Sequence, residues 1–352
     1  MKPAGEPVQR PADARLLVVG ADRALRHLRR GAFASQLRRG DLVIANDAAT
    51  IPASLRGVHL RTGAAIEVRL AARASLAFED VTFSAVLFGE GDHRTPTERR
   101  APPPTVRAGD RLALGPLVAT VEVVLGHPRF VRLTFVGDPG AVWAGIAAHG
   151  RAVQYAYMPA RLALWDTWTP IAGPPAAFEP PSAGFALDWA MLREIRWQGA
   201  RFATLTHAAG LSSTGDAALD TRLPLPEAYR IPSSTVRAIE RARSCGGRII
   251  AVGTTVTRAL EHSAALQGRV VAGDGLADQR LGPASALRVA DAILSGAHEP
   301  GSSHYDLLGA FADAYVLAAA DAELQARGYR THEFGDSVLV WRRRQARVLA
   351  AA

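Results

Sequence analysis

The chain has 352 residues, of which 48% are hydrophobic and 21% charged, so it has room for about two domains and the composition of a soluble globular protein. No apolar run reaches the roughly 18 residues that span a bilayer, and the polar start lacks the apolar core of a signal peptide, so we expect a cytoplasmic protein. The single cysteine, Cys245, excludes an internal disulfide and a zinc site built on cysteines.

The formal net charge is +8, and Lys2 is the only lysine, so almost all of the positive charge is carried by arginine. Arginine pairs bidentately with phosphate and stacks on bases, which fits a nucleic-acid partner. Mutational bias toward arginine and alanine codons would produce the same composition. The charge therefore favours a nucleic-acid partner without establishing one.

In the first half of the chain, the pattern of predicted secondary structure changes near residue 57. Residues 15–19 and 41–46 have the pattern of short buried strands, joined by a basic segment at 21–39. Four short segments rich in valine and leucine then follow one another closely, separated by turn residues: 58–70, 80–88, 111–124 and 130–136. Several short strands at close spacing predict a small β-barrel.

From residue 150 onward, helical and strand patterns alternate. We predict helices at 187–197, 234–244, 254–266 and 304–327, strands at 200–205, 249–252 and 336–341, and either type at 286–294. Alternation of this kind predicts a mixed or mostly parallel sheet covered by helices. The predicted fold is an α/β domain of residues 1–57 and 150–352 that is interrupted by a β-barrel domain of residues 58–149. The proline-rich stretch 170–181 is a long loop, either a lid or a simple connection.

A strand leads through a turn of small residues into a helix at residues 249–261. Gly253 ends the strand, and Thr254 or Thr255 can cap the helix. Free backbone N–H groups at such a helix start attract phosphate or carboxylate. An ordinary connection between strand and helix has the same pattern, so both interpretations stay open.

Polar residues follow other predicted strands as well. Asn46 and Asp47 follow the strand at 41–46, and ligands of open α/β sheets lie beyond such strand ends. Asp47 is either a ligand for a ribose hydroxyl or an adenine edge, or simply a turn residue. His207 follows the strand at 200–205, and His298 lies just before a predicted helix. Each imidazole can move a proton near neutral pH, or belong to the core.

Several common motifs are absent from the sequence. It has no Gly-x-x-x-x-Gly-Lys phosphate loop and no Gly-x-Ser-x-Gly nucleophile elbow. Gly273-Asp-Gly275 lacks the third glycine of a dinucleotide fingerprint and predicts a turn. His298 and His304 lack helical metal spacing, so we expect no metal.

Seven sequence blocks together resemble the S-adenosylmethionine:tRNA ribosyltransferase-isomerase family, in that family's order. The main block is Gly-Arg-Ile-Ile-Ala-Val-Gly-Thr-Thr, residues 247–255, followed by Arg258 and Glu261. The others are Ala14 to Val19, Gly40 to Asp47 with Ile51 to Ala53, Pro181 to Gly184, Thr204 to His207, His298 to Pro300 with Ser302 and Ser303, and Phe334 to Asp336. The blocks span nearly the whole chain, and the resemblance also implies an α/β domain with an inserted barrel.

The resemblance implies an unusual reaction with tRNA as partner. The ribosyl part of S-adenosylmethionine would be transferred to the aminomethyl group of a deazaguanine base at the wobble position and isomerised, giving epoxyqueuosine with release of adenine and methionine. No metal or nicotinamide is required, and we expect a monomer.

The resemblance also implies a set of site residues. Thr254 and Thr255 would hold the methionine carboxylate, and Asp336 or Glu261 would lie beside the sulfonium. The expected catalytic residues are His298, His207 and Asp336, and the expected donor-binding residues are Asn46, Asp47, Gly253, Thr254, Thr255, Arg258 and Glu261.

The sequence also departs from the family pattern. Ala49 and Ser54 stand where the family usually has arginines, and Ala186 replaces a histidine. A histidine-rich segment is replaced by Arg222-Leu-Pro-Leu-Pro-Glu227, and Gly296-Ala297 replaces an asparagine before His298. Three hypotheses follow: the family's tRNA reaction, the same chemistry on another acceptor, or a non-catalytic RNA- or nucleotide-binding relative.

Overall fold

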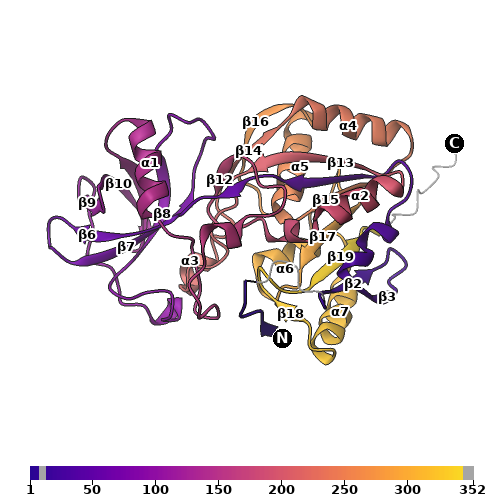
Figure 1. Cartoon of the computed structure of the whole chain (residues 1–352), viewed down its shortest axis with the longest axis horizontal. Coiled ribbons are helices and arrows are strands. Elements are labelled where there is room, and N and C mark those ends of the chain that lie inside the picture. Colours follow the sequence, from indigo (N-terminus) through magenta and orange to yellow (C-terminus); the bar gives the residue numbers. More distant parts are fainter. Residues whose placement is uncertain (8–12, 344–352) are drawn as a thin grey trace.

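The computed structural model describes residues 1–7 and 13–343, which form two lobes lying side by side (Figure 1). One lobe is a helix-covered sheet and the other is a barrel. No helix of the described residues is long and apolar enough to cross a membrane.

A nine-stranded sheet forms the centre of the larger lobe, in the order β16-β14-β13-β4-β15-β17-β19-β2-β3. The central strands β13, β4, β15 and β17 are parallel, whereas β14, β16 and β3 pair antiparallel at the edges. The strands are β2 (Arg15–Val19), β3 (Leu25–Arg29), β4 (Leu42–Asn46), β13 (Arg201–His207), β14 (Glu227–Ile231), β15 (Ile249–Val252), β16 (Gly273–Ala277), β17 (Ala292–Gly296) and β19 (Ser337–Trp341). The sheet confirms the predicted mixed topology.

Helices cover both faces of this sheet because alternate strand residues point to opposite sides. On one face, α4 (Ser233–Ser244), α5 (Thr254–Gln267) and α7 (Ala314–Ala326) pack against residues such as Leu42 and Ile249. On the other face, the 3-10 helix at Arg30–Gln36 and α2 (Trp189–Trp197) pack against Val43 and Ile250. The central strands are therefore apolar on both sides, as buried parallel strands are.

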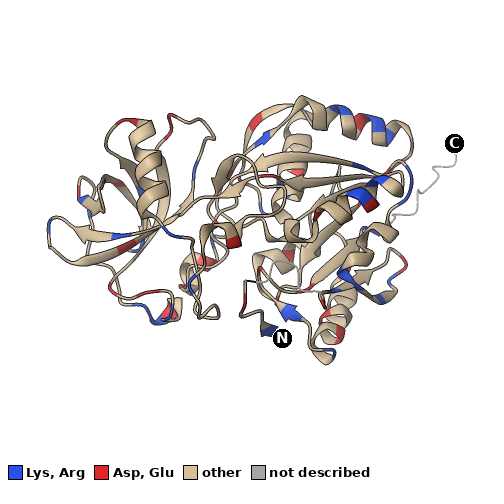
Figure 2. Cartoon of the chain, in the orientation of Figure 1, with Lys and Arg blue, Asp and Glu red and all other residues tan. Residues whose placement is uncertain are grey.

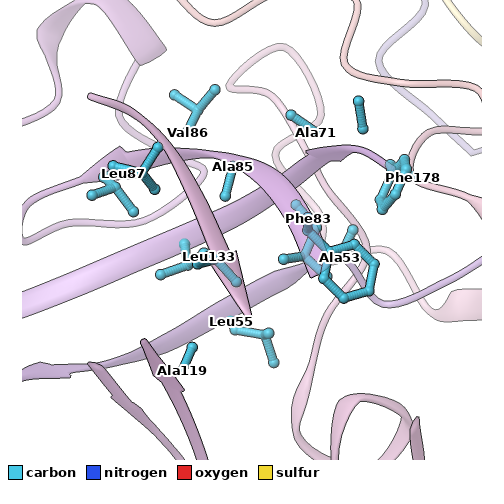
Figure 3. Close-up of a cluster of buried hydrophobic side chains, with 14 of the residues drawn as sticks. Ala53, Leu55, Ala71, Phe83, Ala85, Val86, Leu87, Ala119, Leu133 and Phe178 are labelled. Carbon is cyan, nitrogen blue, oxygen red and sulfur yellow. The ribbon is translucent and has the colours of Figure 1, made fainter. Parts of the chain in front are cut away.

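Six strands close into the predicted barrel, in the order β10-β11-β8-β7-β6-β9. They are β6 (Ser54–His59), β7 (Ala65–Ala72), β8 (Thr82–Phe88), β9 (Arg111–Leu114), β10 (Leu117–His127) and β11 (Phe130–Phe135), and α1 (Pro139–His149) packs beside β10. Phe83, Leu55 and Leu133 fill the barrel core (Figure 3). Phe178, from the larger lobe, packs edge-on against Phe83 with ring centroids 6.1 Å apart, so the two lobes share this core. The inserted barrel is thus confirmed.

The remaining elements are short. β1 (Lys2–Pro3) pairs with β18 (Arg330–Thr331), and β5 (Ala49–Thr50) pairs with β12 (Pro175–Ala177). The short helices are α3 (Ala217–Asp220), α6 (Ser303–Leu308) and 3-10 turns at Thr97–Arg99, Leu164–Thr167 and Ser182–Ala186.

Five predicted elements differ from the structure. The segments 58–70 and 111–124 each contain a turn between two strands, at Gly63 and Gly115, where φ is positive. The predicted connection 21–39 contains β3 and a 3-10 helix. The predicted helix 304–327 is two helices, because the chain turns after Leu308 and α7 begins after Asp313. The predicted turn at Gly273–Gly275 instead begins the edge strand β16.

Candidate active site

A pocket lies beyond the carboxyl ends of β13, β15 and β17, where open α/β sheets bind their ligands. The loop after β12 forms one wall, and the start of α5 forms another. The lining residues are Glu179 to Ala183, Ala209 to Ser212, Pro224, Glu227, Val252 to Thr255, Arg258, Arg280, Leu281, Ser295, Gly296, His298, Ser303, His304 and Leu307.

The start of α5 carries no side-chain cap. Gly253 is the N-cap residue, at φ +93, and Thr254 and Thr255 are the first two helical residues, so the prediction that a threonine caps this helix is wrong. Because no side chain occupies this end, the first-turn N–H groups are available to an anion in the pocket. The positive φ requires glycine at position 253.

Asn46 and Asp47 support the pocket from beneath and do not line it. The Asn46 amide donates to the carbonyl of His207 (2.9 Å) and to the Thr255 hydroxyl (3.4 Å), and its oxygen accepts from the His207 N–H (2.9 Å). The Asp47 carboxylate accepts from the Thr206 hydroxyl at 2.7 Å. Both side chains join the end of β4 to neighbouring elements, and direct donor binding by them stays a prediction.

An ion pair between Arg258 and Glu227 forms the floor of the pocket. The Arg258 guanidinium donates to Glu227 and also to the carbonyls of Leu225 (3.1 Å) and Ala277 (2.6 Å). Glu227 also accepts from the Gly210 N–H at 2.6 Å. Because Arg258 neutralises Glu227, this carboxylate adds little net charge to the pocket.

His207 lies behind Glu227 and is fully buried. Its Nε2 is 3.7 Å from a Glu227 oxygen, and neither ring nitrogen has a hydrogen-bond partner among the described residues. Burial, and then the positive charge of Arg258, hold the pKa of His207 well below its ordinary value, so the ring is neutral at pH 7. Glu227 lines the pocket and His207 does not, so a catalytic role for His207 stays a prediction.

Two other predicted residues lie away from the pocket. Asp336 accepts from the Arg15 N–H (2.7 Å), from the Arg15 guanidinium (2.9 Å) and from the Arg330 N–H (2.8 Å). Glu261 accepts from three consecutive N–H groups, those of Arg288 (2.6 Å), Val289 (3.0 Å) and Ala290 (2.8 Å). Both carboxylates are used in hydrogen bonds that link distant segments of the chain, and neither lines the pocket. These positions do not fit the predicted role beside a sulfonium.

His298 reaches the pocket from the loop after β17, as predicted. Its ring stacks on that of His304, with centroids 4.4 Å apart. Burial, followed by the charges of His304 and His332, holds the pKa of His298 well below its ordinary value. Burial, and then Arg258, lowers the pKa of His304 to about 4. The pocket therefore has two imidazoles that are neutral at pH 7, each with one ring nitrogen that carries no proton.

Glu179 is a lining residue that the sequence interpretation missed. It accepts hydrogen bonds from the Tyr155 hydroxyl and from the Ser212 N–H (3.0 Å). Its only sequence signal is an acidic residue within an apolar, proline-rich loop. Within residues 1–7 and 13–343, no group of three histidine, cysteine or acidic side chains is arranged to hold a metal ion.

The chain is similar to known proteins over nearly its whole length. The family model described as queuosine biosynthesis protein matches residues 2–340. The chain belongs to this family. It is 32% identical to the S-adenosylmethionine:tRNA ribosyltransferase-isomerase of Azoarcus sp. (strain BH72), with 96% of this chain and 93% of that protein covered. It is also 32% identical to the protein of that name from Sorangium cellulosum (strain So ce56), with 96% and 94% covered.

A solved structure of S-adenosylmethionine tRNA ribosyltransferase from Thermotoga maritima is also similar, with 23% identity and a TM-score of 0.49. The match covers 96% of this chain and 95% of that one.

Three of the substituted positions, Ala49, Ser54 and Ala186, are buried, whereas Gly296 and two residues of the substituted segment 222–227, Pro224 and Glu227, line the pocket. Ala49 belongs to β5, and the Ser54 hydroxyl donates to Glu67 in the barrel at 2.9 Å. Ala186 is 6% exposed and packs with Leu187 in the core beneath α2. None of these three side chains lines the pocket. The pocket keeps its helix start and its histidine despite these changes.

Proposed function

We propose that this protein transfers and isomerises the ribosyl part of S-adenosylmethionine onto the aminomethyl group of a deazaguanine base at the tRNA wobble position. The products are epoxyqueuosine in tRNA, adenine and methionine. The observation that carries the proposal is the family match over residues 2–340, which contains every element of the pocket.

The pocket supplies groups that suit this donor. The uncapped start of α5 faces the pocket with the N–H groups of Thr254 and Thr255, which suits the methionine carboxylate. His298, held neutral by its surroundings, suits a proton acceptor during the isomerisation. Catalysis by His298 and donor binding at Gly253, Thr254 and Thr255 are therefore part of the proposal, whereas Arg258 contributes by orienting Glu227.

Two labels on the donor test the proposal. With ribose-labelled S-adenosylmethionine, label should become attached to tRNA that carries the aminomethyl base, whereas label in the methionine part should stay in solution. A tRNA with guanine at the wobble position is the matched control and should stay unlabelled. Ribosyl transfer to a small amine but not to tRNA would instead identify a different acceptor. The expected monomeric state and cytoplasmic location stay predictions.

A further inference from the structure

The buried carboxylates of the described chain differ in how their charge is balanced. Asp41, Glu67, Glu227 and Asp336 each form an ion pair with an arginine, at Arg248, Arg69, Arg258 and Arg15 respectively. Glu261 accepts three backbone N–H groups. Glu179 is also buried, at 6% exposure, but its hydrogen-bond partners Tyr155 and Ser212 are neutral.

A buried carboxylate without a cation is costly, so it binds a proton or a positively charged ligand. Burial raises the pKa of Glu179 to about 7, and the negative charge of Glu333 adds to this effect, whereas the hydrogen bonds from Tyr155 and Ser212 oppose it. Tyr155 stays protonated, because burial raises its pKa well above the ordinary value. The tyrosine therefore acts as a donor and does not supply a positive charge.

The position of Glu179 makes it available to a ligand. It lies in the wall that also contains Pro181 and Ala183, in the same pocket as Thr254, Thr255 and His298. The Cβ of Ala183 lies 3.4 Å from the place where a Cβ on Gly253 would be, so this wall touches the start of α5. The same pocket thus offers a place for an anion at α5 and a carboxylate without an ion pair at Glu179.

We propose that Glu179 is the cation-binding residue of this pocket, holding either the sulfonium of the donor or the ammonium of the acceptor. This inference rests on the proposed function, which supplies both cations. It gives Glu179 the place that Asp336 and Glu261 were expected to fill. A carboxylate attracts either cation, and in a water-poor pocket this attraction is stronger than in water.

Other titratable groups lie in the same pocket or beside it, and one of them provides the control. Arg258, Arg280, His298 and His304 share the main pocket, and on the other side Glu333 accepts from the Tyr157 hydroxyl. Glu333 does not line the main pocket but does line the small recess that Glu179 shares with Tyr155 and Tyr157. Glu333→Gln removes a nearby negative charge from outside the main pocket, so it is the matched control.

The test measures the preference for a charged over an uncharged ligand. In Glu179→Gln, which keeps the shape of the side chain, we compare by calorimetry S-adenosylmethionine with S-adenosylhomocysteine, which lacks the sulfonium charge. A second pair compares aminomethyl-bearing tRNA with guanine-bearing tRNA. If Glu179 binds the sulfonium, the preference in the first pair should fall about tenfold, and if it binds the ammonium, the preference in the second pair should fall instead.

Glu333→Gln should keep both preferences or strengthen them, because loss of the Glu333 charge lowers the pKa of Glu179 and leaves more of it ionised. Unchanged preferences in a folded Glu179→Gln protein, or equal losses in Glu333→Gln, would overturn the inference. The proposed function fails separately, if the wild-type protein binds the donor but never transfers its ribosyl group.

Discussion

At the scale of single residues, His298 is the side chain on which turnover should depend most. It lines the pocket, stacks on His304 and is held neutral by burial. His298→Ala should lower turnover about 100-fold, the usual scale for loss of a general acid or base, while the melting temperature changes little. Rate and melting temperature are measured on the same preparation.

An exposed histidine provides the control for this substitution. His149 lies at the end of α1 on the barrel, so His149→Ala should leave both rate and stability unchanged. A His298→Ala protein that is destabilised but turns over normally per folded molecule would show that His298 is only a core residue.

The pKa of Glu179 makes a prediction about stability. Its value in the folded state, about 7, lies above the ordinary 4.5, so between these pH values the folded protein holds a proton that the unfolded chain releases. The contribution of Glu179 to stability is therefore lost progressively as pH rises from about 4.5 to 7. Glu179→Gln lacks this loss, so its stability relative to wild type should increase across that window and level off above it.

Urea unfolding of both proteins at several pH values between 5 and 8 measures this difference. The pocket histidines titrate in both proteins, so their contributions largely cancel in the comparison. A stability difference that does not change with pH would show that Glu179 ionises normally.

At the scale of elements, the start of α5 is the feature that the donor should need. Thr254 is the first helical residue, a position where proline is tolerated. Thr254→Pro therefore removes one N–H donor from the pocket while the helix persists. Affinity for S-adenosylmethionine should fall about tenfold, as expected for a lost hydrogen bond to a charged group.

A proline at the same position of another helix controls for the backbone change. Ala314 is the first residue of α7 and is exposed, so Ala314→Pro should leave donor affinity unchanged. Calorimetry on both variants decides the matter, and equal affinity in Thr254→Pro and wild type would place the methionine carboxylate elsewhere.

The elements show why some structure was predictable from the sequence and some was not. Strand β15 and helix α5 were predictable because an apolar run, a glycine and a helical apolar face follow one another within a short stretch. The hairpin turn at Gly63 was missed because apolar residues continue on both sides of it. The break between α6 and α7 was missed for the same reason.

Among the pocket residues, too, some were predictable from the sequence and others were not. Gly253, Thr254 and His298 belong to local patterns, and the structure places all three at the pocket. No local sequence pattern marks Glu179 as a site residue, because what distinguishes it is the lack of an arginine ion pair in the folded structure. Conversely, Asp336 belongs to a local sequence block, but its side chain pairs with Arg15, which lies 321 positions away along the chain.

At the scale of the whole molecule, the positive charge predicts how tRNA binding should respond to salt. Arginines lie along α4 and at the end of α2 (Figure 2). Four of them line a groove at the start of β13: Arg196, Arg201, Arg237 and Arg241. If such arginines contact phosphates, tRNA affinity should fall about tenfold or more between 50 and 200 mM salt, the scale for about two neutralised phosphates.

Filter binding of tRNA over this salt range measures the slope. A flat dependence would show that the arginine excess does not serve RNA, even if the pocket binds the donor.

The most direct test of the account as a whole is adenine release from S-adenosylmethionine with and without the acceptor. The family match and the pocket beyond β13, β15 and β17 predict that adenine appears only with tRNA bearing the aminomethyl base, one adenine for each modified tRNA. With guanine-bearing tRNA, or with none, release should stay at background. No adenine release with saturating donor and aminomethyl-bearing tRNA, from a folded protein that binds both, would contradict the account.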